Sequence, residues 1–145
     1  MVSARTLLTG GLNAVRPRPC GPMAASILGT GAFAPGNIVG NSRLVESNGL
    51  DTTPEWIASK TGILERRFAS PETTASDLAT EAALRALEQA GIPPSDVDLF
   101  IVATSTPDFT MPSTACLVQQ KLGVEGGMAF DITNACAGFV TALDI

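Results

Sequence analysis

The chain has 145 residues, of which 9 are Lys or Arg and 14 are Asp or Glu, and it contains neither His nor Tyr. This length suits one domain that can bury a core. The absence of His excludes self-contained Ser-His-Asp or Cys-His catalytic groups and His-ligated metal sites, and the absence of Tyr excludes Tyr acid/base chemistry. If the chain is an enzyme, it lacks the His or Tyr side chain that commonly transfers protons in an active site.

The charge pattern argues against a nucleic-acid partner. Residues 1–45 contain only basic charges, while residues 46–145 contain every one of the 14 acidic residues. An acidic body repels phosphate backbones. The mean hydropathy of +0.26 is too apolar for a disordered chain, and no apolar run approaches the roughly 18 residues that a membrane span requires. We therefore expect a soluble protein with neither nucleic acid nor membrane as a partner.

The cysteine pattern predicts a reducing environment. The three cysteines are Cys20, Cys116 and Cys136. Their number is odd and their spacing fits neither a zinc site nor a small disulfide framework, so we expect a cytoplasmic protein without a metal ion. Residues 1–23, rich in Gly, Pro and Arg, are expected to be an appendage: either a mis-assigned start, with the natural one at Met23, or a targeting segment. A transit peptide there would instead place the protein in an organelle.

The first half of the remaining chain predicts one strand and two short helices. The apolar run 24–33, closed by glycines, predicts a strand that ends in a turn at 35–37. A short helix is expected to start near Asn41. A second helix is predicted over 53–62, where a Thr N-cap, a Pro in the first position and a closing Gly mark its limits. Residues 63–72 are expected to form a connector.

The second half has the alternation of a layered α/β fold. The clearest helix is predicted from Thr74 to Ala90, because Thr-x-x-Asp resembles a capping box and Gly91 follows the last turn. Its alanine-rich face implies close approach to another layer. It is followed by a predicted strand over 97–104, a helix over 112–122, a strand over 127–132 and a helix from 136. This order indicates a mostly parallel sheet, and the last helix has no stop signal before Ile145, so we expect a fragment.

A glycine pattern near the start resembles a dinucleotide-binding fingerprint. Gly29-x-Gly31-x-x-Ala34 follows the first predicted strand, and Asp51 lies at a suitable distance for a ribose contact. However, Pro35 immediately afterwards prevents the helix whose N-terminus would hold the pyrophosphate. We therefore interpret the two glycines as sites of tight backbone packing and a turn.

Cys136 is the candidate nucleophile. It follows a strand, lies among small residues and opens a helix, where backbone N–H groups and the helix dipole favour a thiolate. The arrangement resembles the strand-turn-helix elbow of hydrolases. A packed core turn is the alternative interpretation. Cys116, inside a predicted helix, is interpreted as a small packed side chain.

Four blocks together resemble a known family. The segments GTGAFAP, PEWIASKTGILERR, IVATSTPDFTMPSTAC and DITNACAGF occur in the order and spacing of β-ketoacyl-acyl-carrier-protein synthase III. The resemblance covers residues 24–145. It implies a thiolase-like layered αβαβα fold, of which this chain would be the N-terminal half: the first of two repeats, truncated.

The resemblance also implies an activity. Cys136 looks like the nucleophile that takes an acyl group, commonly acetyl, from coenzyme A. Malonyl-acyl-carrier protein would then lose carbon dioxide and condense with the thioester to a 3-ketoacyl-carrier protein, initiating fatty acid synthesis without a cofactor. The family is a homodimer, and its His and Asn, which polarise the malonyl thioester, would lie beyond Ile145. This chain alone is thus expected to be acylated at most.

Further residues match the family's substrate-binding positions. By resemblance, Trp56 stacks on the coenzyme A adenine and Thr52 lies nearby, although a core aromatic is the alternative for Trp56. Lys60 replaces a common Arg and therefore lacks a planar stacking surface. Leu64 stands where a basic residue is common. Met111 matches the residue that reaches into the partner's acyl pocket, where many relatives have Phe.

Two alternatives remain. The first is another acyl-CoA condensing enzyme of this fold, for polyketide, quinolone or long-chain ketone synthesis. The second is a non-catalytic truncated chain. In either case we expect an exposed sheet edge and an apolar flank on the Cys136 helix, and therefore poor solubility.

Overall fold

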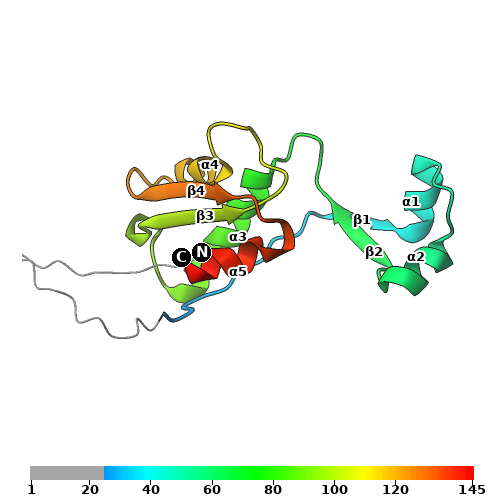
Figure 1. Cartoon of the computed structure of the whole chain (residues 1–145), viewed down its shortest axis with the longest axis horizontal. Helices are drawn as coiled ribbons and strands as arrows, with labels where there is room; N and C mark the ends of the chain where they lie inside the picture. The colour runs from blue at the N-terminus through cyan, green and yellow to red at the C-terminus, as the bar shows by residue number, and fades with distance from the viewer. Residues whose placement is uncertain (1–24) are drawn as a thin grey trace, which may run out of the picture.

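The computed structural model describes residues 25–145, so the predicted appendage at 1–23, the alternative start Met23 and Cys20 lie outside the described residues. The elements in chain order are β1 (Asn37–Gly40), α1 (Asn41–Asn48), α2 (Pro54–Thr61), β2 (Glu65–Phe68), α3 (Ala75–Ala90), η1 (Pro94–Asp96), β3 (Leu99–Ala103), α4 (Thr114–Lys121), β4 (Met128–Ile132), η2 (Ala135–Ala137) and α5 (Gly138–Asp144). They form two parts: a body with β3, β4, α3, α4 and α5, and a projecting unit with β1, α1, α2 and β2 (Figure 1). None of the helices in the described part is long and apolar enough to cross a bilayer.

The body has a layered α/β arrangement around one parallel strand pair. Strands β3 and β4 pair in parallel, with Leu99 opposite Met128 and Ala103 opposite Ile132. Helix α4 connects them and packs on one face together with α3, while α5 packs against the other face (Figure 1). Parallel strands need such a crossover connection. Because helices cover both faces of the pair, the strands are made mostly of apolar residues. The predicted α/β layering is confirmed.

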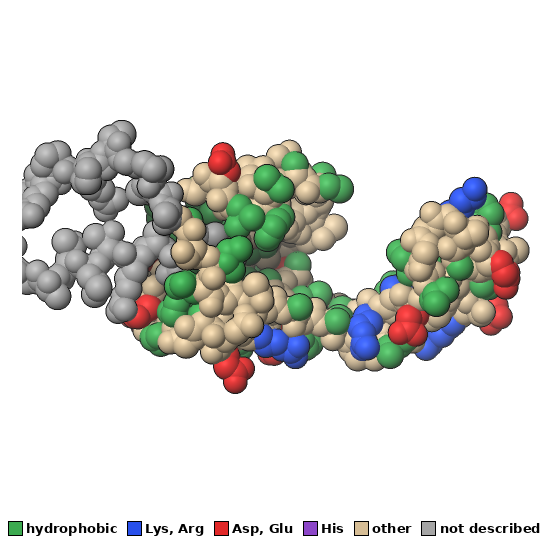
Figure 2. Space-filling view, turned by 90° about the horizontal axis from the view of Figure 1, so that it is seen from below, with side chains coloured by type: hydrophobic (Ala, Val, Ile, Leu, Met, Phe, Trp, Pro, Cys, Tyr) green, Lys and Arg blue, Asp and Glu red, His purple; other side chains and the backbone are tan. Residues whose placement is uncertain are grey.

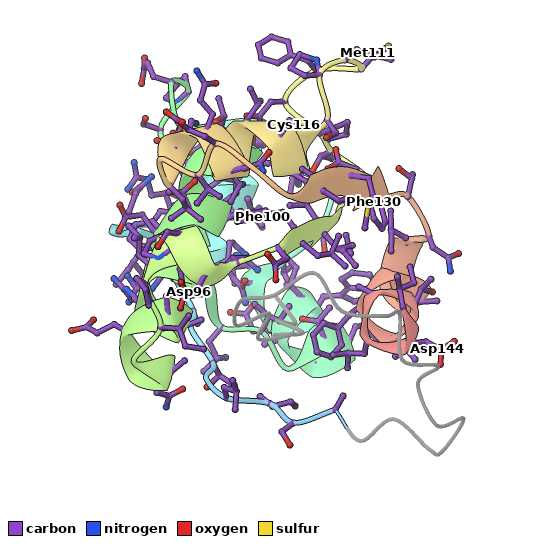
Figure 3. The ribbon with its side chains drawn as sticks, turned by 90° about the vertical axis from the view of Figure 1, so that its left-hand side faces the viewer. Asp96, Phe100, Met111, Cys116, Phe130 and Asp144 are labelled. Atoms are coloured by element: carbon purple, nitrogen blue, oxygen red, sulfur yellow. The ribbon has the colours of Figure 1, made fainter. Side chains whose placement is uncertain are left out.

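The core lies between the strand pair and helices α3 and α4. Phe100 is 1% exposed and points into this space (Figure 3). Its buried cluster consists of Leu87, Val97, Phe100, Ala115 and Val118. Burial of a side chain of this size contributes about 1.5–3 kcal/mol. The core therefore holds the strand pair against helices α3 and α4.

Helix α3 forms where the sequence predicted it. The Thr74 side chain accepts a hydrogen bond from the Asp77 backbone N–H, and the Asp77 carboxylate accepts one from the Thr74 backbone N–H. Gly91 ends the helix in the left-handed conformation. The extended segment before β1 lies against the alanine face of this helix. A Cβ at Gly29 or Gly31 would overlap backbone atoms of α3. The interpretation of these glycines as sites of tight packing is confirmed.

The projecting unit is held together by a buried asparagine. Asn41 is 6% exposed, and its Nδ2 donates to the carbonyl oxygens of Ile63, at 2.8 Å, and Pro54, at 3.3 Å. Its Oδ1 accepts a 2.7 Å hydrogen bond from Arg66 Nη2. Strands β1 and β2 pair antiparallel beside it, with Asn37 opposite Phe68. One side chain thus connects the start of α1, the start of α2 and strand β2.

Two predictions for this half of the chain are wrong. Residues 25–36 do not form a strand, because they run along α3, where the Thr30 hydroxyl donates to the Gln89 side-chain oxygen at 3.1 Å, and no strand lies beside them among the described residues. The strand is instead β1, which begins at Asn37, the last residue of the predicted turn. Residues 63–72 are not only a connector, since they contain β2. The described part contains two separate two-stranded sheets: β3 and β4 pair in parallel, as predicted, whereas β1 and β2 form an antiparallel pair that was not predicted.

The other boundaries shift by a few residues for local reasons. The two short helices, α1 and α2, lie as predicted, and Thr53 caps α2. Strand β3 starts at Leu99, because the preceding residues form the 3₁₀ turn η1. Helix α4 starts at Thr114, because Ser113 serves as its N-cap.

Candidate active site

Cys136 lies at the carboxyl end of the parallel strand pair. It belongs to η2, the 3₁₀ turn that follows β4 and leads into α5. Strand β3 ends at the same edge, where the Thr104 N–H donates to the Ile132 carbonyl at 3.1 Å. The carboxyl edge of parallel strands is where ligands bind in α/β folds. Cys136 is exposed, so the alternative of a cysteine packed in the core is wrong.

The turn that carries Cys136 has an unusual backbone. Ala135 has a φ of +41°, the one positive φ of a non-glycine residue in the described part. Such conformations are costly for L-residues and cluster at functional sites. The Ala137 N–H then closes the 3₁₀ turn by donating to the Asn134 carbonyl at 3.0 Å. Because of this turn, the regular helix begins at Gly138 and not at Cys136 as predicted.

The turn is fixed to α5 and to β3 by contacts that sequence analysis missed. Asn134 Nδ2 donates to Thr141 Oγ1 at 3.1 Å, and this hydroxyl donates to the Ala137 carbonyl at 3.0 Å. Gly138 is buried against Ala103 at the end of β3. One signal was available: a Thr inside a helix commonly donates to the carbonyl four residues earlier, which here belongs to the cysteine turn.

Met111 lies on the loop that leaves the same edge of the sheet. Its side chain is 85% exposed and extends away from α4 (Figure 3). The loop is anchored by Asp108, whose Oδ1 accepts a 3.0 Å hydrogen bond from the Ser76 backbone at the start of α3. Partial burial disfavours the charged form of Asp108, but the hydrogen bonds from Ser76 outweigh it and lower the pKa. The anchored loop presents Met111 to solvent.

A second carboxylate at the start of α3 is paired with a lysine of α4. Lys121 Nζ lies 2.6 Å from Asp77 Oδ1. The hydrogen bond from Lys121, supported by that from the Thr74 backbone, lowers the pKa of Asp77 from 3.8 to about 2. This ion pair ties the end of α4 to the start of α3, beside the loop anchor.

Asp131 holds the other end of α4. Its two carboxylate oxygens accept hydrogen bonds from the backbone N–H groups of Thr114, at 2.7 Å, and Ala115, at 2.8 Å. A carboxylate at a helix N-terminus satisfies donors that have no partner within the helix. A single acidic residue within the apolar strand segment MAFDI was the sequence signal for such a partner.

The predicted coenzyme A residues gather on the projecting unit. Thr52 and Trp56 line one open depression, together with Asp51 and Thr53. Trp56 is 55% exposed, so the alternative of a core aromatic is wrong. Lys60 is exposed one helical turn further along α2. In Figure 2, Lys, Arg, Asp and Glu side chains gather on this unit, while the face of the body seen there is mainly apolar and neutral.

The structure does not bring all the predicted residues together. Helix α2 lies at the far end of the projecting unit, whereas α5 and the cysteine turn belong to the body (Figure 1). Only the extended segment before β1 and the loop after β2 join the two parts. Trp56 and Cys136 thus lie in two separate parts of the chain, which are two candidate half-sites.

Within residues 25–145, the second thiol, Cys116, and the acidic groups form no further centre. Cys116 is partly buried, and its Sγ accepts a hydrogen bond from Ser113 Oγ at 3.1 Å, in agreement with a packed side chain. Among residues 25–145, no three His, Cys, Asp or Glu side chains lie close enough together to hold a metal ion.

Solved structures of condensing enzymes resemble this fold. The chain is 49% identical to 3-oxoacyl-[acyl-carrier-protein] synthase III from Aquifex aeolicus, with a TM-score of 0.75 over 81% of this chain and 37% of that one. It is 39% identical to β-ketoacyl-[acyl-carrier-protein] synthase III from Thermus thermophilus, with a TM-score of 0.74 over 83% and 36%. It is 38% identical to the priming β-ketosynthase of the R1128 polyketide pathway, with a TM-score of 0.75 over 81% and 34%. A scan against protein-family models finds no match.

These similarities define the class. The layered α/β body, with a cysteine at the carboxyl edge of its parallel strands, is that of a condensing enzyme of the thiolase-like fold. Within this class the chain belongs to the family of β-ketoacyl-acyl-carrier-protein synthase III. It spans about a third of the length of the solved structures it matches.

Proposed function

We propose that Cys136 accepts an acyl group from an acyl-coenzyme A, commonly acetyl-CoA. The observation that carries this proposal is the exposed cysteine on a strained turn between a parallel strand and a helix. The Cys136 sulfur attacks the thioester carbonyl, a bond forms between Sγ and the acyl carbon, and the bond to the coenzyme A sulfur breaks. The thiol proton goes to the departing coenzyme A thiolate. Exchange of one thioester for another keeps the acyl group activated for the next step.

The second step of the proposed reaction is a decarboxylative condensation. Malonyl-acyl-carrier protein loses carbon dioxide, and the resulting carbanion attacks the Cys136 thioester carbonyl. A carbon–carbon bond forms and the bond to Sγ breaks, which gives a 3-ketoacyl-carrier protein and the Cys136 thiolate; water supplies the proton that restores the thiol. This step needs groups that polarise the malonyl carbonyl. The family supplies a His and an Asn for this, and the chain contains no His. We therefore propose that these 145 residues support acyl transfer and not condensation.

Coenzyme A is proposed to bind across the two half-sites. Its adenine would stack on Trp56, beside Thr52, because an aromatic ring that is half exposed offers a free π-face. The ammonium of Lys60 would lie near the phosphates as a point charge, without the bidentate geometry of an Arg. The acyl end of the ligand would then reach Cys136.

Met111 is proposed to contact the acyl chain in a homodimer. Its side chain is 85% exposed on an anchored loop and therefore makes little contact within its own chain. Exposed Met side chains adapt to apolar ligands of different shape. In the proposed dimer, Met111 would enter the partner's acyl pocket and influence chain-length preference.

The test of the nucleophile is a mass measurement. The protein is incubated with acetyl-CoA, and its intact mass and peptide map are recorded. We expect one acetyl group, released by hydroxylamine and located on Cys136. Cys136→Ala should lose this modification, whereas the matched control Cys116→Ala should keep it. Acetyl transfer that survives in Cys136→Ala would refute the assignment.

The docking proposal has its own test. Trp56→Ala should raise the acetyl-CoA concentration at half-maximal rate by about tenfold and leave the maximal rate nearly unchanged, because stacking on one base is worth about 1–3 kcal/mol. Trp56→Phe should retain much of the affinity. A fall in the maximal rate alone would argue against a role in binding.

A second candidate is another condensing enzyme of the same fold, for instance in polyketide synthesis. The observation in its favour is the R1128 priming β-ketosynthase match, whose TM-score of 0.75 equals that of the Aquifex aeolicus enzyme. A panel of acyl-CoA donors separates the two, since a fatty acid initiator prefers acetyl-CoA. Strong preference for a longer or branched acyl donor would favour the second candidate.

A further inference from the structure

Gly138 lies at the tightest contact between α5 and the strand pair. It is the one buried residue of α5, and a Cβ built on it would lie 2.9 Å from the Cβ of Ala103. Side-chain carbons do not approach so closely, and the short Ala103 side chain cannot turn away. The first turn of α5 therefore reaches the end of β3 only because residue 138 has no side chain.

The backbone of Gly138 does not itself require glycine. Its φ of −56° and ψ of −41° are ordinary helical values. An alanine inside a helix is normally more favourable than a glycine, because glycine has more conformational freedom to lose. Local helix propensity therefore predicts that Gly138→Ala would be tolerated or stabilising. The need for glycine at this position comes from space alone.

The cysteine turn is coupled to the same helix. The Thr141 hydroxyl accepts from Asn134 Nδ2, before the turn, and donates to the Ala137 carbonyl, after Cys136. These two hydrogen bonds span Cys136 and attach both sides of η2 to α5. A displacement of α5 from β3 is thus transmitted to the cysteine.

We propose that Gly138 is a positioning residue, whose close contact with Ala103 sets the place of the Cys136 thiol relative to the carboxyl edge of β3 and β4. This inference rests on the proposed acyl transfer to Cys136. The contact fixes the separation of α5 from β3, and the Thr141 hydrogen bonds carry the turn with the helix. Acyl transfer depends on this geometry, because the sulfur must approach the thioester carbonyl along a defined direction.

The test compares Gly138→Ala with a size-swapped double variant in the full chain. Acetyl transfer from acetyl-CoA is followed under single-turnover conditions by intact mass. We expect the maximal rate in Gly138→Ala to fall by about tenfold, which is less than the roughly hundredfold loss that a 1 Å misplacement can cause. The concentration at half-maximal rate should stay unchanged, since the coenzyme A residues lie on the projecting unit. The double variant Ala103→Gly/Gly138→Ala, which restores the space, should recover most of the rate.

Two further measurements separate positioning from general damage. Alkylation of Cys136 by iodoacetamide, mapped by peptide mass, needs only an accessible thiol and should be unchanged in Gly138→Ala. The melting temperature should fall only slightly, because the higher helix propensity of alanine partly offsets the overpacked contact with Ala103. Gly126→Ala is the matched control, because a Cβ there meets no atom within 4 Å. It should match the wild type in every measurement.

Several results would overturn the inference. The first is a wild-type acetyl transfer rate in Gly138→Ala. The second is a fall in that rate which the double variant does not repair. The third is a fall in that rate which is accompanied by slower alkylation of Cys136 and a large fall in the melting temperature. If Gly138→Ala does not fold, Thr141→Val takes its place, since it removes both hydrogen bonds at constant shape; a wild-type rate in that variant also contradicts the proposal. A wild-type protein that gains no acetyl group refutes the proposed function itself, and this inference with it.

Discussion

The backbone N–H of Thr114 donates a hydrogen bond of 2.7 Å to the carboxylate of Asp131, which joins the first turn of α4 to the middle of β4. The second oxygen of the carboxylate accepts from Ala115. Both donors lie in the buried first turn of α4, so they have no access to water when the acceptor is removed. The pairing therefore contributes both to helix capping and to the core.

Asp131→Ala should lower the free energy of unfolding by about 1.5–3 kcal/mol, the range for hydrogen bonds to a charged group. Asp131→Asn should lower it less, because the amide oxygen can still accept one hydrogen bond. Urea denaturation followed by circular dichroism measures both. Asp98→Ala, an exposed aspartate just before β3, is the control and should change stability by less than about 0.5 kcal/mol. Equal effects of Asp98→Ala and Asp131→Ala would contradict this role.

The Lys121–Asp77 ion pair predicts acid sensitivity. Because the folded pKa of Asp77 is lowered from 3.8 to about 2, its stabilising effect is present above the unfolded pKa and is lost as the pH falls through the folded pKa. The pKa of Asp108 is also lowered, so its ionised form stabilises the folded state in the same direction. Stability should therefore decline from about pH 4 toward pH 2. Urea unfolding at a series of pH values measures this decline.

Lys121→Met should flatten that decline, because it removes the largest cause of the Asp77 pKa shift. The stability difference between wild type and variant should be clear near neutral pH and small near pH 2. Lys60→Met, at an exposed position of α2, serves as the charge-matched control. A constant difference between wild type and Lys121→Met across this pH range would show that the lysine acts through packing instead.

Asn41→Ala should destabilise the projecting unit selectively. The substitution removes two donated hydrogen bonds and leaves Arg66 without its 2.7 Å acceptor, a loss of about 2–3 kcal/mol. Trp56, the only Trp of the chain, lies in this unit, so its fluorescence reports local unfolding. The fluorescence transition should shift to lower urea concentration, while circular dichroism, dominated by the body helices, should shift less. Coincident shifts, or an equal effect of the exposed control Asn48→Ala, would argue against a local role.

Gly31→Ala should destabilise the body, because the added Cβ would overlap the α3 backbone at Ala82 and Ala86. The expected loss of unfolding free energy is about 1–3 kcal/mol, as for overpacked sites. Gly36→Ala is the matched control, since a Cβ there has no neighbour within 4 Å. Thermal unfolding of the two variants gives the comparison. If both melt as the wild type does, the segment before β1 does not pack on α3 as described.

Elements with a local signal were predictable from the sequence. Helix α3 carries its own capping box and closing glycine, and α2 has a Thr cap followed by Pro, so both were placed to within a residue. Strands β3 and β4 were found from their apolar runs. The turn that carries Cys136 was placed from the small residues between an apolar strand and a helix. The class of fold then followed from the alternation of these elements.

Features that depend on distant partners were not predictable. Residues 25–36 have the composition of a strand, but strand formation needs a neighbour, and the glycines here fit the alanine face of α3 instead. Strand β2 is polar and was missed, because only its pairing with β1 makes it a strand. The placement of Gly138 against Ala103 requires the crossing of α5 over β3, which no local pattern contains.

The antiparallel pairing of β1 with β2 brings the two ends of the projecting unit together, with Asn37 directly opposite Phe68. Residues 37–68 therefore leave the body and return to it at adjacent positions, and the hydrogen bonds of Asn41 hold this unit together. An insertion of this kind can change its sequence, or be exchanged for another hairpin-ended unit, without moving β4 or the turn after it. The proposed binding of coenzyme A on this unit and the proposed acyl transfer at Cys136 can thus evolve as separate modules on one chain.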